Sequence, residues 1–270
     1  MHAKYNKLIH ILRELKSVAV AYSGGVDSSF LLYAVKESSI DAIAITANSP
    51  ATPKEDIKLA ISFASELNIP HRIIETDELY RREFCENTEM RCFYCKDILF
   101  SSIKKIIKDK DIQWIIEGSN ADDLKDYRPG LKARERHNVR SPLIEVGLTK
   151  KEIRELSKTF GLKTWQRPSS PCLSSRFPYG TRITPEGLGM VEQAEEFLKS
   201  LGFKTLRVRH HGHLARIEVS QEDIVRFFDD HLRRTVVEEF LRIGYKFVSL
   251  DLEGFKSGKL NRIINNYNQC

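Results

Sequence analysis

The sequence predicts an α/β fold in which a doubly wound, mostly parallel sheet is followed by a smaller C-terminal α+β domain. Up to about residue 168, short apolar segments that suit buried strands alternate with amphipathic segments that suit helices. Beyond about residue 180 the order changes to helix, hairpin, helix and strand. We therefore expect one domain over residues 1–168 and a second over residues 169–270.

Four short apolar segments are the predicted strands of the sheet. They cover residues 17–22, 41–46, 71–75 and 112–118. Helix-length segments separate them, and a parallel strand pair needs a connection of that length. The sheet should therefore be parallel, with helices on both of its faces.

The helices of this first part follow from the spacing of apolar residues and from end signals. The chain opens on an amphipathic helix pattern, which is not that of a signal peptide. Its apolar positions are Leu8, Leu12 and Leu15, and further helices are predicted over residues 53–67, 96–108 and 150–160. Capping boxes are expected at two of these helices, formed by Thr52 with Glu55 and by Thr149 with Glu152.

The C-terminal part combines helices with a small sheet. A helix over residues 185–201 precedes a hairpin over residues 203–219. Ser220 is placed to cap another helix, and a strand over residues 246–252 leads into a polar tail. This mixture is typical of an α+β domain.

Composition limits the class of protein. The 270 residues are 41 % hydrophobic and 30 % charged, as in an ordinary globular protein. No apolar run reaches the roughly 20 residues of a membrane span, so we expect a cytoplasmic protein without a membrane partner. A net charge of +6 favours an anionic partner without choosing between a nucleotide and RNA.

The stretch VAVAYSGGVDSS carries the clearest chemical signal. A buried strand runs into Ser23, Gly24, Gly25, Val26, Asp27 and Ser28, and an apolar helix follows. Two glycines let the backbone approach an anion, while serine hydroxyls and helix N-terminal amides donate hydrogen bonds. There is no Walker lysine, and SGGVDS resembles the pyrophosphate loop of the ATP pyrophosphatases. ATP is the expected ligand.

A second polar segment, EGSNADD, follows the predicted strand that ends near residue 117. Asp122 and Asp123 are candidate Mg²⁺ ligands, because carboxylate oxygens suit this ion. A solvated acidic loop is the alternative.

Five cysteines are spread unevenly, and without a secretory signal a disulfide framework is not expected. Cys92 and Cys95 form a C-x-x-C pair just before a predicted helix, and with Cys172 they could hold a [4Fe–4S] cluster. An inert core thiol is the alternative for Cys95. Cys85 and Cys270 are interpreted as incidental.

Cys172 lies in a stiff loop, PSSPCLSSRFPYG, between Arg167 and Arg176. Positive charge nearby lowers the pKa of a thiol, although both arginines could instead face a phosphate. Arg207 and Arg209 alternate along a predicted strand and therefore share a face. Two guanidinium groups so placed suit a phosphate monoester.

Seven segments together resemble, in order and spacing, the LarE-type sulfur transferases of the ATP pyrophosphatase (PP-loop) superfamily. These are SGGVDS, RCFYCK, EGSNADD, SPLIEVGLTKKEIR, PCLSSRFPYG, RVRHHG and LDLEGFKSGKLN. The resemblance covers nearly the whole chain. It implies an enzyme of nickel-pincer cofactor synthesis that adenylates a carboxylate of pyridinium-3,5-biscarboxylic acid mononucleotide, releases pyrophosphate and replaces AMP with sulfur.

The resemblance also implies roles for single residues. Arg207 and Arg209 would hold the substrate phosphate, and we add Arg176 to this set. In sacrificial members the cysteine matching Cys172 donates its own sulfur and becomes dehydroalanine, whereas other members carry extra cysteines and a [4Fe–4S] cluster. The cysteine count favours the cluster slightly. The family forms homohexamers.

Three rival functions stay open. One is a cluster-dependent tRNA thiolase of the same superfamily, although we find no RNA-binding module and expect no nucleic-acid partner. Another is a nucleotide sensor that binds ATP without turnover. The third is an amidating enzyme, which would give Cys172 no role.

Overall fold

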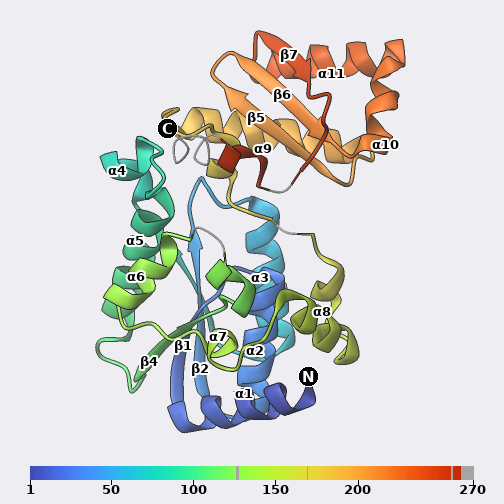
Figure 1. Ribbon diagram of the computed structural model, residues 1–270. Coiled ribbons are helices and arrows are strands. Elements are labelled where there is room, and N and C mark those ends of the chain that lie inside the picture. The colour runs from blue at the N-terminus through green and yellow to red at the C-terminus, as the bar shows by residue number, and fades with distance from the viewer. Residues whose placement is uncertain (126–127, 169, 257, 263–270) are drawn as a thin grey trace. The chain divides into compact units, whose positions relative to one another are not determined.

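The computed structural model describes residues 1–125, 128–168, 170–256 and 258–262, and the chain divides into two compact units (Figure 1). The first unit comprises Met1–Glu78 and Met90–Pro171, and the second comprises Leu79–Glu89 and Cys172–Cys270. The segment 79–89 therefore belongs to the second unit although its sequence neighbours belong to the first. Cys270 lies outside the described residues.

The sheet of the first unit has four strands, all parallel, in the order β3-β2-β1-β4. Its strands are β1 (Ser17–Ala21), β2 (Asp41–Asn48), β3 (His71–Glu75) and β4 (Trp114–Glu117). All four predicted strands are confirmed, and β4 begins two residues later than the predicted segment. The strands can all be parallel because each connection is long enough for a crossover helix.

Helices cover both faces of this sheet, as the sequence predicts. The α-helices of the unit are α1 (His2–Leu15), α2 (Val26–Ser38), α3 (Lys54–Glu66), α5 (Arg91–Ile107), α6 (Gly130–Arg136), α7 (Pro142–Glu145) and α8 (Lys150–Thr159). Short 3₁₀ segments are η1 (Glu78–Tyr80), which continues into the second unit, η2 (Ala121–Lys125) and η3 (Lys163–Gln166). Figure 1 shows α5 and α6 on one side of the strands and α2, α3 and α8 on the other.

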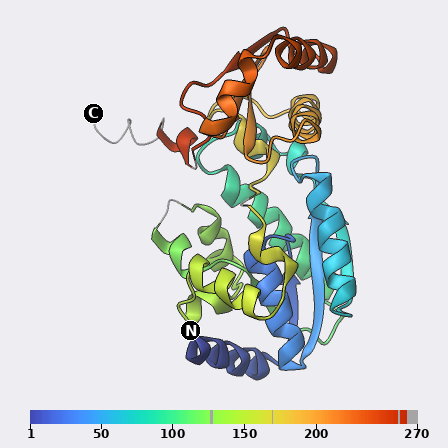
Figure 2. The same cartoon turned by 90° about the vertical axis from the view of Figure 1, so that its right-hand side faces the viewer.

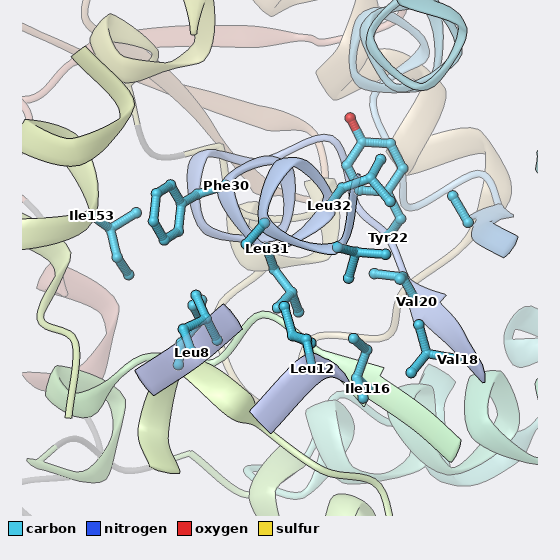
Figure 3. Packing of buried hydrophobic residues seen from close by; sticks show 14 of the residues in the cluster. Leu8, Leu12, Val18, Val20, Tyr22, Phe30, Leu31, Leu32, Ile116 and Ile153 are labelled. Carbon is cyan, nitrogen blue, oxygen red and sulfur yellow. The ribbon is translucent and has the colours of Figure 1, made fainter. Parts of the chain in front are cut away.

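Alternate residues of β1 enter two different cores. Val18 and Val20 pack with α1, α2, α3 and α8, whereas Ala19 packs with residues of α5 and α6. Figure 3 shows side chains of α1 and β1 gathered against α2. Figures 1 and 2 show α1 lying across the amino ends of the strands, beside α2. The two helix layers cover both faces of the sheet, and loops follow the carboxyl ends of its strands.

The helix ends test the predicted caps. At α8 the capping box is confirmed, because Thr149 accepts from the Glu152 backbone and Glu152 accepts from the Thr149 backbone. At α3 the prediction is wrong, since the helix begins at Lys54 with Pro53 as its N-cap. The Thr52 N–H donates to the Ser49 carbonyl instead. A turn before the helix therefore takes the place of the predicted cap.

The second unit contains a small mixed sheet in the order β5-β6-β7. Its elements are α4 (Arg82–Cys85), η4 (Leu173–Arg176), α9 (Pro185–Ser200), β5 (Leu206–His211), β6 (Leu214–Val219), α10 (Gln221–Ile224), η5 (Val225–Phe228), α11 (Asp230–Ile243), β7 (Phe247–Leu250) and η6 (Lys259–Asn261). The helix expected after Ser220 is split. Ser220 precedes only the short α10, and the long α11 is capped by Asp229.

Asn87 joins the segment 79–89 to the chain that follows η4. It is fully buried, and its Nδ2 donates to the carbonyls of Phe177, Pro178 and Thr181 at 3.3, 2.7 and 3.1 Å. The Asn87 carbonyl accepts from the Gly180 N–H. The two hydrogens of this amide nitrogen are thus shared among three backbone carbonyls of an irregular loop.

None of the helices within the described ranges is long and apolar enough to span a bilayer.

Candidate active site

The carboxyl ends of β1 and β4 lie side by side, because Ala21 of β1 is in register with Glu117 of β4. The SGGVDS loop leaves the first strand and the EGSNADD segment leaves the second. They touch: a Cβ added at Gly118 would lie 2.9 Å from the backbone N and Cα of Ser28. This edge is where an open parallel sheet binds its ligand.

The phosphate loop is held by its own serines. Gly24 adopts a φ of +69°, a conformation that favours glycine, and Gly25 is the N-cap of α2. The hydroxyls of Ser23 and Ser28 lie 3.1 Å apart, and Ser28 Oγ donates to the Gly25 carbonyl. The loop therefore presents backbone N–H groups at the positive end of a helix, an arrangement that suits pyrophosphate.

Asp27 is the carboxylate inside this loop. Its Oδ2 accepts from Lys150 Nζ at 2.7 Å and from Asn120 Nδ2 at 3.3 Å. Its Oδ1 is buried and has no hydrogen-bond partner among the described residues. Burial raises the pKa of Asp27, although Lys150 and Asn120 act in the opposite direction. An unpaired buried carboxylate oxygen is unfavourable unless a ligand completes it, and a cation bound with the phosphates would do so.

Asp122 and Asp123 are already engaged by the protein. Asp122 accepts from the Lys150 N–H at 2.9 Å and from Lys125 Nζ at 3.2 Å. Asp123 accepts from the Asn120 N–H at 3.0 Å and pairs with Arg128 at 2.9 Å. Each aspartate thus shapes the loop beside the phosphate site, and their role as Mg²⁺ ligands stays a prediction.

The donor set fits a shared Mg²⁺ better than a site made by protein alone. Within either described unit, no three side chains of His, Cys, Asp or Glu are grouped to hold a metal ion. Mg²⁺ in nucleotide enzymes is held by one or two carboxylates together with phosphate oxygens. Asp27 Oδ1 is the oxygen best placed to contribute.

Glu117 links the end of β4 to the C-x-x-C turn. It accepts from Lys96 Nζ at 2.8 Å, from Ser119 Oγ at 2.7 Å and from Ser141 Oγ. Burial disfavours its charge, but these partners outweigh burial and hold the pKa of Glu117 below its usual range. Since Lys96 directly follows Cys95, this ion pair anchors the first turns of α5 beside the end of the strand.

The cysteines are placed differently from one another. Cys92 is exposed and Cys95 half-buried, and both lie inside α5, because that helix begins earlier than predicted. Cys85 is buried and donates from Sγ to the Leu79 carbonyl, and burial raises the pKa of its thiol. Cys172 is exposed and belongs to the second unit. The three-cysteine cluster stays a prediction.

The two arginines that flank Cys172 in sequence face different groups. Arg167 donates to the Gly24 carbonyl of the phosphate loop and to the Asp56 carboxylate. Arg176 is buried and forms a two-pronged ion pair with Glu195, at 2.9 and 2.8 Å. Its Nη1 donates to the Cys172 carbonyl at 3.1 Å and to Ser175 Oγ at 2.9 Å. Arg176 thus fixes the backbone that carries the thiol.

Arg207 and Arg209 share one face of β5, as predicted from the alternation of a strand. Arg209 pairs with the fully buried Glu218 at 2.9 and 2.7 Å and donates to the Ser175 carbonyl. The Arg207 guanidinium lies 5.0 Å from the centre of the Phe255 ring. Burial, followed by the charge of Arg176, lowers the pKa of Arg207 to about 10.

Cations outnumber carboxylates in this part of the second unit. The cations are Arg176, Arg207, Arg209, Arg216 and Lys259, and the carboxylates are Glu195, Glu218, Asp251 and Glu253. A partly buried cluster with excess positive charge is stabilised by a bound anion. We call it the arginine cluster.

Sequence reasoning did not assign Lys150, Asn120 or Glu117 to the site. Lys150 offered a signal, because it is the first residue of α8 and a cation there opposes the helix dipole. Its ion pair with Asp27 explains the position. Asn120 and Glu117 stand within the quoted EGSNADD segment, but only their contacts distinguish them from their neighbours.

Several proteins are similar to this chain over almost its full length. The uncharacterized protein slr1717 of Synechocystis is 40 % identical over 98 % of this chain and 99 % of its own. The pyridinium-3,5-bisthiocarboxylic acid mononucleotide synthase of Lactiplantibacillus plantarum is 36 % identical over 94 % of this chain and 92 % of its own. Both similarities extend across both units.

Two further similarities cover only part of the chain. A family model of the tRNA methyl transferase HUP domain matches residues 16–93. The tRNA-specific 2-thiouridylase MnmA of Rickettsia rickettsii is 24 % identical over 60 % of this chain and 55 % of its own. The full-length similarity to the named synthase decides the family. The chain therefore belongs to the LarE-type sulfurtransferases of the PP-loop superfamily.

Proposed function

We propose that this chain uses ATP to activate a carboxylate of pyridinium-3,5-biscarboxylic acid mononucleotide and then replaces an oxygen of that carboxylate with sulfur. The observation that carries the proposal is the 36 % identity with the synthase of Lactiplantibacillus plantarum over 94 % of the chain. The phosphate loop and the unpaired oxygen of Asp27 support ATP as the activating substrate.

In the first step, the substrate carboxylate attacks the α-phosphorus of ATP, and pyrophosphate leaves with the electrons of the broken P–O bond. Residues Ser23–Ser28 hold the leaving pyrophosphate through backbone N–H groups and hydroxyls. Asp27, with Asp122 and Asp123 as further candidates, would hold Mg²⁺, which neutralises phosphate charge. The arginine cluster binds the phosphate monoester of the mononucleotide through the half-buried Arg207, while the buried Arg209 and Arg176 add positive charge behind it.

In the second step, the Cys172 thiolate attacks the acyl carbon and AMP leaves, which gives a thioester. Removal of the Cys172 Cα proton then breaks the Cβ–S bond, whose electrons stay on sulfur. The products are a thiocarboxylate and dehydroalanine at position 172. In the alternative, a [4Fe–4S] cluster with Cys92, Cys95 and Cys172 as ligands would accept an additional sulfide and pass it to the acyl carbon, where it would displace AMP and leave the cysteine intact.

Intact mass before and after turnover separates these two routes. The full chain, purified without oxygen and assayed for iron and sulfide, is mixed with ATP and the pyridinium substrate. A loss of the mass of H₂S located at residue 172 supports sacrifice, whereas a bound cluster with unchanged protein mass supports relay. Substrate-dependent pyrophosphate release should survive in Cys172→Ser, which should form no thiocarboxylate. Absence of pyrophosphate release from the unmodified chain would overturn the proposal.

A tRNA thiolase is the second candidate, favoured by the partial similarity to MnmA. It predicts tight, salt-sensitive binding of bulk tRNA, because phosphate contacts dominate such binding. We expect no such binding in a gel-shift experiment. We further propose a cytoplasmic homohexamer with no membrane or nucleic-acid partner, and light scattering of the purified chain tests its mass.

A further inference from the structure

We propose that Arg167 is a positioning residue of the phosphate loop. It holds the peptide between Gly24 and Gly25 so that the Gly25 N–H faces the pyrophosphate portion of ATP. This inference rests on the function proposed above, because it assigns the part of ATP that the loop binds.

The contacts of Arg167 come from within the first unit. Its Nη1 donates to the Gly24 carbonyl at 2.5 Å, and its Nη2 donates to the carboxylate of Asp56 in α3. The side chains of Arg167 and Asp56 are only 15 % and 12 % exposed. The Arg167 carbonyl accepts from Arg154 Nη2 of α8 at 2.7 Å. Asp56 therefore holds the guanidinium of Arg167, and Arg154 holds its backbone.

The direction of one peptide decides what the loop can bind. In a trans peptide the C=O and N–H bonds point in opposite directions, and no cis peptide occurs in the described residues. A guanidinium on the Gly24 carbonyl therefore turns the Gly25 N–H away from Arg167, on the side where this N–H makes a long hydrogen bond of 3.4 Å to Ser23 Oγ. We expect the pyrophosphate to replace this weak partner. Rotation of this peptide would point a carbonyl oxygen at the phosphates, which repel it.

The two glycines alone do not fix the direction of the peptide between them. Glycine adopts positive and negative φ with similar ease, so the peptide between Gly24 and Gly25 can rotate unless a contact holds it. Gly24 is pressed against α3, since a Cβ there would lie 3.1 Å from Ala60 Cβ and from the Asp56 carbonyl. The same helix carries the Asp56 carboxylate. An arginine is required because its planar fork reaches a carbonyl and a carboxylate together.

Binding of three probes to the full chain tests the role of Arg167. The probes are ATP, inorganic pyrophosphate and adenosine. For Arg167→Ala we expect the Kd of ATP and of pyrophosphate to rise by on the order of tenfold or more, the effect of losing one charge-assisted hydrogen bond. The Kd of adenosine should not change. Arg167→Lys should recover part of the affinity, because an ammonium can reach one acceptor but not hold both in a plane.

Two further variants distinguish the loss of the Arg167 contacts to Gly24 and Asp56 from the loss of a positive charge in general. Asp56→Asn keeps the size of the side chain that Arg167 contacts but removes its charge. It should therefore raise the Kd of pyrophosphate, but by less than Arg167→Ala does. Arg136→Ala removes the same net charge from a surface pair with Asp97 and should leave every Kd within about twofold.

The outcomes separate this inference from the proposed function. If the unmodified chain binds neither ATP nor pyrophosphate, the proposed function fails and this role with it. If the unmodified chain binds both and Arg167→Ala binds pyrophosphate equally well, the role of Arg167 alone is overturned. An equal loss of adenosine affinity in Arg167→Ala would also overturn it, because general damage to the unit does not discriminate between probes.

Discussion

The phosphate loop of the first unit and the arginine cluster of the second unit are both suited to phosphate, yet they are built in opposite ways. The loop offers backbone N–H groups, two serine hydroxyls and a helix N-terminus, and its carboxylate keeps one oxygen unpaired. The cluster offers guanidinium groups that are themselves buried against Glu195 and Glu218. The loop is built from backbone donors, whereas the cluster is built from buried arginines that are paired with carboxylates.

This difference predicts where mutations will act. In the cluster, Glu195 and Glu218 neutralise the buried Arg176 and Arg209, so the loss of either carboxylate should be felt first in the stability of the fold. In the loop, small changes of backbone position should be felt first in ligand affinity. Comparison of stability with affinity in each unit therefore tests the contrast.

The largest effect is expected from Glu195→Gln. Arg176 is only 2 % exposed, and Glu195→Gln removes the charge of the carboxylate that pairs with its buried guanidinium at two points. We expect the free energy of unfolding to fall by about 3–5 kcal/mol, as when one partner of a buried ion pair is removed. Urea denaturation of the full chain measures this.

The neighbouring Glu196→Gln is the matched control, because Glu196 is exposed on the same helix. Its unfolding free energy should stay within about 0.5 kcal/mol of the unmodified chain. Equal stability of the Glu195 and Glu196 variants would show that the buried ion pair between Arg176 and Glu195 does not stabilise the cluster.

An intermediate effect is expected from Gly118→Ala. The added methyl would lie 2.9 Å from backbone atoms of Ser28, so the start of α2 must shift. We expect destabilisation of about 1–3 kcal/mol from overpacking and a clear rise in the Kd of pyrophosphate. Calorimetric titration and thermal unfolding measure the two effects.

Gly189→Ala adds the same methyl in the interior of α9, where the nearest atom is 4.0 Å away. This control should be stabilising by about 0.5–1 kcal/mol, because alanine favours a helix. Unchanged pyrophosphate binding in Gly118→Ala would show that the contact between Gly118 and the phosphate loop does not affect ligand binding.

The smallest effect is expected at the cap of α8. Hydrogen bonds from Lys4 and the Thr149 backbone lower the pKa of Glu152 from 4.5 to about 2. A carboxylate whose pKa is lower in the folded state contributes stability above about pH 4.5 and loses it as the pH falls towards 2. Glu152→Gln should therefore cost about 1 kcal/mol near neutral pH.

The loss should shrink below pH 4, where the unmodified chain also loses this contribution. Unfolding measured across this pH range tests the effect, with the exposed Glu155→Gln as the control on the same helix. A constant difference at every pH would argue against an ionic contribution from Glu152.

The sequence was informative where local chemistry decides the structure. Buried strands, the phosphate loop and the Thr149 cap are encoded within a few neighbouring residues. Thr52 shows the limit, because a cap and a turn compete for the same residues before Pro53 and only the turn forms. Element existence was therefore easier to predict than element boundaries.

Long-range partners were beyond the sequence. Arg167 and Arg176 flank the same thiol, yet the first contacts Gly24 and the second contacts Glu195. Arg167 and Gly24 are 143 residues apart in the chain. Spacing along a loop cannot predict such a contact, since it depends on how α3 and α8 pack around the end of β1.

The Asn87 contacts have a consequence for the order in which the chain folds during synthesis. The segment 79–89 is made about ninety residues before the loop whose carbonyls Asn87 binds. Until that loop is synthesised, Asn87 lacks these three acceptors, although the whole of the first unit has by then been made. A fragment that starts at residue 172 would never receive this segment, and the carbonyls of Phe177, Pro178 and Thr181 would lose their shared donor. The second unit is thus continuous in space but cannot be made as one continuous piece of chain.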